Sequence, residues 1–560
     1  MGEVLTFDNS VLRYRNLAEE RAEKGDFLGA LSFLFSAKSI AKSHEVIMDI
    51  AYIYSDMSLF ELSNKYWFLY LDCAPKEKQA IAYEELAINY FYMDNYWASS
   101  YCFHKKLDVD GYITKEGLDK EIIDFFSGEE MKKSAYRLVY PFDRVDYSRD
   151  EKIAKHFLAI GAFEEAKKPL QSIPPEFRSI DASGELALAN YMVENLDEAE
   201  KVCRESLKNH GENVTAYCHL STVYNMRKDE ENAEFYYQKA LSVRKGEKGE
   251  EYNLATCAIE RNDHVNANLS LKQILEDRPY EATMRFFYAI SFLNLGKYER
   301  ALDEFKTSYR INPDDRVVYY YLKSTEALLS GDKTLERYLP VKYEKELPQQ
   351  VEKEYSELLK KLTTEPLKME FYIKDKRVRQ AIEWGIFCGS EQAPKDAVFA
   401  LSNAYGKYAK ELIRKTLLDP EIKEEIKRVL IYVSIVSGVK EKFGVTVGSF
   451  YLKIKPKKLK CERADDGAIY FSAYALCMAR MVFFEAENLD RIGKEIDKIY
   501  LKLSKVISEA EVSNEELAAL LVSECEFKWI KKDNDVMKLF EITAEKLKKL
   551  KAIYRGENYD

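Results

Sequence analysis

The sequence predicts an all-α protein in which helix–turn–helix units follow one another along a solenoid. Four alanines recur at one constant interval: Ala199, Ala233, Ala267 and Ala301. A period between about 20 and 50 residues is typical of arrays of repeated supersecondary units. Other residues keep the same register: Leu220, Leu254 and Tyr288; Tyr237, Leu271 and Phe305; and Pro279 and Pro313.

The spacing of apolar residues within one unit, residues 282–315, is helical. Four residues at i, i+3, i+4 and i+7 form one face of a first helix: Arg285, Tyr288, Ala289 and Phe292. Gly296 follows them, and glycine readily adopts the left-handed conformation that ends many helices. Pro313 ends the unit because proline cannot continue a helix. A single unit of this size cannot bury its apolar face, so several stacked units are expected.

This pattern resembles the tetratricopeptide repeat (TPR), a helix–turn–helix unit of about 34 residues. In the unit at 282–315, Arg285 stands where the family has tryptophan, and Ser308 stands where it has a small apolar residue. The resemblance implies a right-handed superhelix of stacked repeats. The concave side of such a superhelix offers an extended surface to a protein or peptide partner.

The register of the repeats divides the chain into four predicted regions. Residues 11–107 contain three repeats, and residues 108–146 form a divergent repeat or spacer. Residues 147–335 contain about five repeats and a half repeat. Residues 336–560 are mainly helical and show neither a repeat period nor a resemblance to a known family. Alternating β-branched and aromatic residues predict one β-hairpin in this last region, near residues 444–455.

Apolar periodicity places the helices of the last region. They are predicted at residues 350–362, 378–387, 397–418, 422–437, 468–485, 489–506, 514–530 and 536–554.

Composition and charge exclude several classes of partner. The net charge is −10, and residues 1–330 hold 42 Lys and Arg against 56 Asp and Glu. Nucleic-acid binding needs a basic surface, so we expect no nucleic-acid partner.

The nine cysteines are scattered without a CxxC pair, which is typical of free thiols in a reducing compartment. No secretory signal and no uninterrupted apolar run of membrane-spanning length occurs, so we expect a cytoplasmic protein without a membrane partner.

The sequence contains no recognisable catalytic or metal-binding motif. None of the six histidines forms the paired spacing of a zinc protease, and His264 is the last of them. Cys388-Gly389-Ser390 resembles a thiol-protease nucleophile turn, but no histidine follows in that half of the chain to activate it. Neither type of glycine-rich phosphate loop occurs. We therefore expect no catalytic residues, no metal and no cofactor, and predict that the protein is not an enzyme.

The resemblance to TPRs also implies which residues face the groove. In that family the concave surface is lined mainly by positions 2, 5, 9, 12 and 13 of each first helix. These positions imply a partner-binding groove formed by Leu188, Tyr191, Met192, Met226, Tyr252, Ile259, Phe286, Ile290 and Tyr320. The same positions include Thr222, Glu260, Leu293 and Asn294. A groove this apolar suits an apolar peptide or an amphipathic helix.

One familiar TPR ligand does not fit these positions. Family members that bind the acidic tails of heat-shock chaperones use a clamp of lysine, asparagine and arginine. Here only Asn253 falls at such a position, and Gly249, Thr283 and Phe287 replace the basic partners. A carboxylate without cations would bind poorly in this groove. We therefore do not expect an acidic chaperone tail as the partner.

These observations predict a non-enzymatic scaffold or adaptor for a protein or peptide partner. One alternative is a regulatory peptide sensor in which residues 336–560 act as the output or occlude the groove. A tethered segment has a high effective concentration, so self-occlusion and an external ligand both remain open from the sequence. The least favoured alternative is an enzyme with its site in residues 336–560.

Overall fold

The structure is a computed structural model of the 560-residue chain. It describes residues 7–41, 43–93, 95–110, 154–155, 157–158, 161–364, 369–389, 392–402, 404, 406–423, 426–427, 430–431, 442–447, 450–454, 473, 477, 489–503, 512–525, 533–540 and 542–556. Contacts divide the chain into two compact units. Unit 1 comprises Met1–Arg15, Ala37–Arg144 and Lys353–Asp560, and unit 2 comprises Asn16–Ser36 and Val145–Glu352. The boundaries of the four predicted regions differ from this division and remain predictions. Most of the predicted spacer at 108–146 lies outside the described residues.

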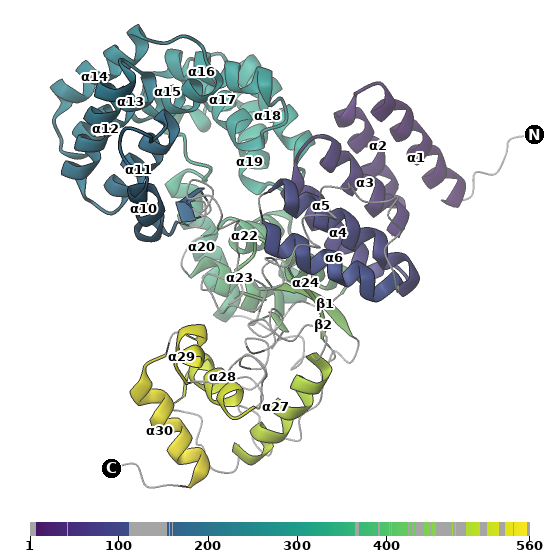
Figure 1. Ribbon diagram of the computed structural model, residues 1–560. Helices are drawn as coiled ribbons and strands as arrows, with labels where there is room; N and C mark the ends of the chain where they lie inside the picture. Colours follow the sequence, from purple (N-terminus) through teal and green to yellow (C-terminus); the bar gives the residue numbers. More distant parts are fainter. Residues whose placement is uncertain are drawn as a thin grey trace, which may run out of the picture. The chain divides into compact units, whose positions relative to one another are not determined.

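Unit 2 contains a regular array of helix pairs (Figure 1, blue to teal). Its helices are α10 (Phe163–Ser172), α11 (Ile180–Met192), α12 (Leu196–His210), α13 (Val214–Met226), α14 (Glu230–Ser242), α15 (Lys248–Glu260), α16 (His264–Asp277), α17 (Ala282–Asn294), α18 (Tyr298–Ile311) and α19 (Arg316–Leu329), followed by the 3-10 turn η2 (Leu335–Tyr338). The first helices α11, α13, α15, α17 and α19 begin at the same constant interval as the alanines, and so do the second helices α12, α14, α16 and α18. The predicted all-α repeat architecture is confirmed.

The small residues that revealed the period lie where the two helices of each pair meet. Ala199, Ala233, Ala267 and Ala301 on the second helices have no exposed surface. In one pair, the Ser221 hydroxyl on the first helix donates a hydrogen bond to the Ala233 carbonyl at 2.7 Å. A larger side chain at the alanine positions would push the two helices apart, which explains why small residues recur there.

The turn between the two helices of each pair has one residue in the left-handed region. These residues lie one repeat period apart: Glu194, Lys228, Asn262 and Gly296, with φ values of 62°, 62°, 56° and 71°. In the second of these turns, the Lys228 amide donates to the Asn225 carbonyl, and the Asp229 amide donates to the Tyr224 carbonyl, both at 2.9 Å. These bonds satisfy carbonyls that would otherwise lack partners at the end of the first helix.

The N-terminal part of the chain forms helix pairs of the same kind. Helices α1 (Phe7–Glu23) and α2 (Phe27–Ile40) precede α3 (His44–Asp56), α4 (Phe60–Cys73), the 3-10 turn η1 (Lys76–Lys78), α5 (Gln79–Tyr92) and α6 (Tyr96–Asp110), and residues 16–36 of the first two belong to unit 2. Here serines on the second helices donate to alanine carbonyls on the first, from Ser63 to Ala51 at 2.8 Å and from Ser99 to Ala87 at 2.5 Å. The division of residues 11–107 into three repeats remains a prediction.

The C-terminal residues add further helices. They are α20 (Gln349–Thr364), α21 (Met369–Tyr372), α22 (Lys376–Phe387), α23 (Ala393–Ser402), α24 (Lys407–Leu418), α27 (Leu489–Leu503), α28 (Asn514–Ser523), α29 (Asp533–Phe540) and α30 (Ala544–Arg555). Two predicted helices, at residues 397–418 and 536–554, are each divided in two. Gly406, with a φ of 101°, separates α23 from α24, and Thr543 caps the start of α30. The predicted helix at 468–485 lies almost entirely outside the described residues, and the one at 422–437 lies mostly outside them.

A short hairpin follows α24. Strand β1 (Phe443–Val447) pairs antiparallel with β2 (Phe450–Ile454), with Val445 opposite Leu452. The predicted hairpin near residues 444–455 matches this pair of strands. The buried Lys427 donates to both the carbonyl and the hydroxyl of Thr446, at 2.7 and 2.8 Å.

Within unit 1, this C-terminal segment is bonded to helix α4. Asp72, near the end of α4, accepts hydrogen bonds from the Gly444 amide at 3.0 Å and the Tyr451 hydroxyl at 3.3 Å. It also pairs with Arg414, while its own side chain is only 9% exposed. Earlier in α4, Lys65 pairs with Asp419 at 2.6 Å. Helix α24, Asp419 and the two strands are therefore bonded directly to helix α4.

Candidate peptide-binding groove

The last residues of four successive first helices occupy equivalent positions, one in each repeat, and together they form a row. The row consists of Met192, Met226, Glu260 and Asn294, which end α11, α13, α15 and α17. Met192 is 48% exposed and Met226 is 44% exposed. Glu260 is also exposed, whereas Asn294 is half-buried. We call these four residues the helix-end row.

All nine groove residues predicted from the sequence lie on first helices. They are Leu188, Tyr191 and Met192 on α11, Met226 on α13, Tyr252 and Ile259 on α15, Phe286 and Ile290 on α17, and Tyr320 on α19. Besides the two exposed methionines, five of them are half-buried: Leu188, Tyr191, Tyr252, Ile259 and Tyr320. Their role in binding remains a prediction.

The remaining two, Phe286 and Ile290, are core residues rather than groove residues. Neither has any exposed surface. The centroid of the Phe286 ring lies 5.9 Å from that of Phe305 in its own repeat and 5.5 Å from that of Tyr321 on α19. An external partner therefore cannot reach these two side chains in this structure. The difference arises because the next repeat supplies an aromatic ring to this position.

Helices α11 and α13 approach each other closely at Gly184. A Cβ added to Gly184 would lie 2.6 Å from Thr215 Cγ2, so no side chain fits there without a shift. Next to it, the Tyr191 hydroxyl lies 3.5 Å from His219 Nδ1. Burial lowers the pKa of His219 to about 4, so this imidazole is neutral near pH 7.

Glu260 is the charged member of the helix-end row. The Thr222 hydroxyl donates to its carboxylate at 2.8 Å. Desolvation by the surrounding protein raises the pKa of Glu260 and outweighs the opposing effects of Thr222 and Arg261.

A segment of the chain itself lies against the last part of this array. Residues 339–347 follow η2, and Val341, Tyr343 and Leu347 are buried, whereas Lys342 and Glu344 are exposed. Tyr343 contacts both α16 and α17. Its hydroxyl lies 3.0 Å from His264 Nδ1, and its ring packs edge-on against Phe287 with a centroid distance of 6.3 Å.

The last member of the helix-end row binds the backbone of this segment. Asn294 Nδ2 donates to the Val341 carbonyl at 2.8 Å, and the Val341 amide donates to Asn294 Oδ1 at 2.7 Å. Further along, Lys345 pairs with Asp315 at 2.7 Å. Sequence reasoning placed Asn294 in the groove but did not identify its ligand. The available signal was the alternation of Val341-Lys342-Tyr343-Glu344 between two prolines, Pro340 and Pro348.

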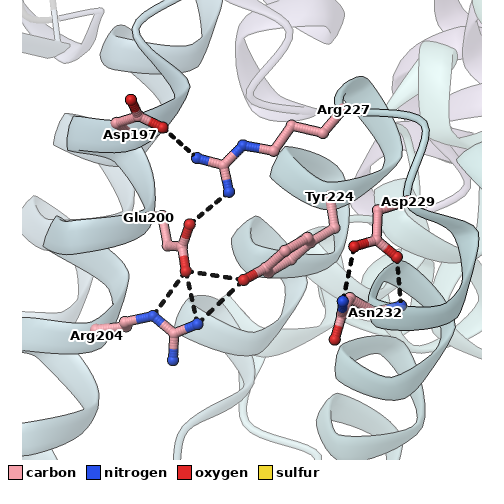
Figure 2. Close-up of polar contacts among 7 residues, drawn as sticks. All are labelled: Asp197, Glu200, Arg204, Tyr224, Arg227, Asp229 and Asn232. Carbon is pink, nitrogen blue, oxygen red and sulfur yellow. Dashed lines mark hydrogen bonds and ion pairs between the residues drawn. The ribbon is translucent and has the colours of Figure 1, made fainter.

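A charged network fixes the end of α13 next to Met226. Figure 2 shows Glu200 on α12 surrounded by Arg204, Tyr224 and Arg227. Arg227, which follows Met226, bonds Glu200 at 2.5 Å and Asp197 at 2.6 Å. Burial alone would raise the pKa of Glu200, but hydrogen bonds from Arg227, Tyr224 and Arg204 lower it to about 2.

The same ion pair recurs one period later. Arg261 and Glu234 occupy the positions that Arg227 and Glu200 hold in the preceding repeat, and they pair at 2.5 Å. The residue that caps the next helix also recurs. Asp229 and Asp263 each accept a hydrogen bond from the backbone amide three residues on, at 3.1 and 3.0 Å. Polar contacts thus repeat with the same period as the apolar core.

Two further observations concern only the described residues. No group of three or more His, Cys, Asp or Glu side chains among them is placed to hold a metal ion. None of the helices in the described ranges combines the length and apolar content that crossing a membrane requires.

Comparison with known families identifies one repeat directly. Residues 214–246 match the sequence model of the tetratricopeptide repeat. This stretch is a tetratricopeptide repeat. It contains α13, α14 and the exposed Met226, and the flanking TPR-like pairs keep its spacing. The match does not extend to residues 336–560, and no curated protein matches the chain.

Several solved TPR structures resemble the chain weakly. Yeast Tom70 is 12% identical, with 93% of this chain and 100% of that chain covered and a TM-score of 0.28. YrrB, described as a TPR protein with an unusual peptide-binding site, is 17% identical, with 30% and 88% covered and a TM-score of 0.23. The P58(IPK) TPR domain is 16% identical, with 58% and 99% covered and a TM-score of 0.24. All three TM-scores are below 0.5.

Proposed function

We propose that this protein is a non-enzymatic interaction scaffold that binds an apolar or amphipathic peptide of a partner protein along the first helices α11, α13 and α15. The observation that carries the proposal is the exposure of Met192 and Met226 at equivalent ends of neighbouring first helices. Half-buried apolar groups lie on the same helices, among them Leu188 and Ile259. Flexible methionines adapt to apolar ligands of varied shape, which supports this choice of partner.

The polar groups near this surface support the exclusion of an acidic chaperone tail. Asn253, the one residue at a clamp position, already donates to Thr215 at 3.0 Å. Phe287 at another clamp position packs against Tyr343. Glu260 adds a negative charge to the helix-end row, and it would repel a carboxylate-rich ligand.

The proposal is tested by placing charges in the exposed part of the row. The double variant Met192→Glu, Met226→Glu should lose at least 90% of partner capture from native lysate, because the apolar contact is replaced by two desolvated carboxylates. Partners are quantified by mass spectrometry on immobilised full-length chain. The matched control, Val265→Glu with Leu269→Glu, changes two exposed apolar residues on the second helix α16 and should capture partners normally.

Capture that is equal for wild type and the methionine variant, with unchanged melting temperatures, would show that α11 and α13 are not the binding surface. Charges at Tyr252 and Phe286, two of the other predicted groove residues, would not give a clear result. Phe286 has no exposed surface, so a glutamate there would disrupt the core whatever its effect on binding.

A further inference from the structure

We propose that residues 339–347 are a tethered occupant of a peptide site formed by α16, α17 and the start of α19, and that this site takes an extended partner peptide with an apolar residue two positions before a tyrosine. The inference rests on the proposed function, because it names the class of peptide that the helix-end row recognises. It also identifies the segment that competes with that peptide.

Asn294 binds the backbone of the segment at one residue. Its side-chain amide satisfies both the N–H and the C=O of a single residue, Val341. An asparagine side chain carries a carbonyl acceptor and an NH₂ donor, so this pairing uses each kind of group once. The two hydrogen bonds recognise backbone groups rather than a side chain. They are therefore available to any chain that presents an extended residue at this point.

Buried and exposed residues alternate along the segment. Val341 and Tyr343 are buried, while Lys342 and Glu344 are exposed. Burial of every second residue is the pattern of an extended chain lying on a surface, whereas a helix would bury residues three and four apart. The occupant seen in the structure thus favours an extended partner over an amphipathic helix at this end of the array.

The site that holds Tyr343 includes a polar partner as well as an apolar wall. The Tyr343 ring packs against Phe287 and lies 5.8 Å from the His264 ring, and its hydroxyl reaches His264 Nδ1. A site that hydrogen-bonds a substrate hydroxyl discriminates strongly against a ligand that lacks it. We therefore expect a preference for tyrosine over phenylalanine at this position.

The occupied site is continuous with the helix-end row. Asn294 occupies the same register position as the exposed residues Met192, Met226 and Glu260. The segment contacts the row at its last member, and the three preceding members are exposed. The occupied site is therefore one end of a longer row whose other members have exposed surface.

The tether determines how strongly an external peptide must compete. A short flexible connection gives effective concentrations on the order of millimolar. An external peptide with micromolar intrinsic affinity would then bind the wild-type chain about 10- to 1,000-fold more weakly than it binds a chain whose segment is released.

The test uses the full-length chain and a fluorescein-labelled peptide with the sequence of residues 339–348, followed by fluorescence anisotropy. The release variant Val341→Asp, Tyr343→Ser changes only the segment and should bind the peptide at least 10-fold more tightly than wild type does. Adding Asn294→Ala to the release variant should remove this gain. A peptide with phenylalanine in place of Tyr343 should bind at least 10-fold more weakly than the parent peptide.

The control variant Lys342→Ala, Glu344→Ala changes exposed residues of the same segment and should bind the peptide no better than wild type. A release variant that keeps its helical circular dichroism and gains no affinity would overturn the proposal. A release variant that loses its helical signal would also overturn it, because the segment would then be a structural part of the array. The methionine variants test α11 and α13, whereas this peptide tests the site on α16 and α17, so a failure of this inference can be distinguished from a failure of the proposed function.

Discussion

Single residues with positive φ set the turn inside each repeat, and the chain fills this position in two ways. One repeat uses Gly296, whereas three others place Glu194, Lys228 or Asn262 there. The left-handed conformation costs an L-residue with a side chain about 1–2 kcal/mol, and glycine avoids that cost. The turns therefore contain residual strain that the surrounding repeat structure holds in place.

Replacing Lys228 with glycine should stabilise the repeat. Lys228 is exposed, and its side chain makes no hydrogen bond or ion pair with the described residues, so the substitution relieves the backbone without removing such a contact. We expect an increase in the free energy of unfolding of about 0.5–1 kcal/mol, since added freedom of the unfolded chain offsets part of the gain. Thermal unfolding followed by circular dichroism measures it. Gly296→Ala is the reverse change and should lower the melting temperature; a Lys228→Gly variant that melts earlier would contradict the account.

Glu200 links stability to pH at the residue scale. Its pKa is about 2 in the folded chain, against an ordinary value of 4.5. A carboxyl with a lowered folded pKa stabilises the protein fully above its unfolded pKa, and the contribution disappears as the pH falls from about 4.5 towards 2.

The variant Glu200→Gln should therefore lose about 1–3 kcal/mol at pH 7, because Arg227 and Arg204 lose their shared carboxylate. The difference in melting temperature from wild type should narrow as the pH is lowered from 5.5 to 3.5. Glu198→Gln removes an exposed pair with Lys201 and serves as the control, with an expected effect below about 0.5 kcal/mol. A gap that stays constant over this pH range would exclude the proposed role of Glu200.

At the scale of helices and strands, local sequence patterns predicted the elements wherever one repeat period determines how the helices pack. The constant interval between the alanines predicted the first and second helices of unit 2, because each repeat contacts its neighbours in the same way. Alternation predicted the hairpin at β1 and β2. The predicted helix at 397–418 was wrong in its continuity, since Gly406 takes a φ of 101° that breaks it. Apolar periodicity alone does not show such a break.

Contacts between elements distant in sequence could not be predicted. Asp72 bonds Arg414, Gly444 and Tyr451, which lie in the C-terminal part of the chain. The pairing of Asn294 with Val341 could not be predicted either, because no local sequence pattern connects a helix end with a later segment. The burial of Phe286 likewise depends on Tyr321 in the next repeat. Each of these features is tertiary, and the pattern of a single sequence does not show which distant residues meet.

The contact at Asp72 makes a prediction for unit 1. Asp72→Ala leaves Arg414 without this carboxylate and removes the acceptor for Gly444 and Tyr451, so we expect a loss of about 2–4 kcal/mol. Hydrogen exchange should show faster exchange at the Gly444 amide and along β1. Asp533→Ala breaks an exposed pair with Lys551 in the same unit and should cost less than about 1 kcal/mol. If Gly444 remained as protected as in wild type, the bond to Asp72 would not be what holds this hairpin.

At the scale of the whole molecule, each unit contains a segment that follows repeats in the sequence and contacts their helices. In unit 1 strands β1 and β2 bond helix α4, and in unit 2 residues Val341 and Tyr343 contact α16 and α17. The two proposals together describe a scaffold with exposed row residues on α11, α13 and α15 and an occupied site on α16 and α17. Partner binding and displacement of the segment are then separate events on one array.

The most direct test of this account is the affinity of the captured partner for the full-length chain, measured by isothermal titration calorimetry. The account predicts that Met192→Glu, Met226→Glu weakens binding at least 10-fold, while Val265→Glu, Leu269→Glu leaves it within twofold of wild type. Equal affinities for wild type and the methionine variant, with both chains folded, would contradict the central claim that the helix-end row is the binding surface.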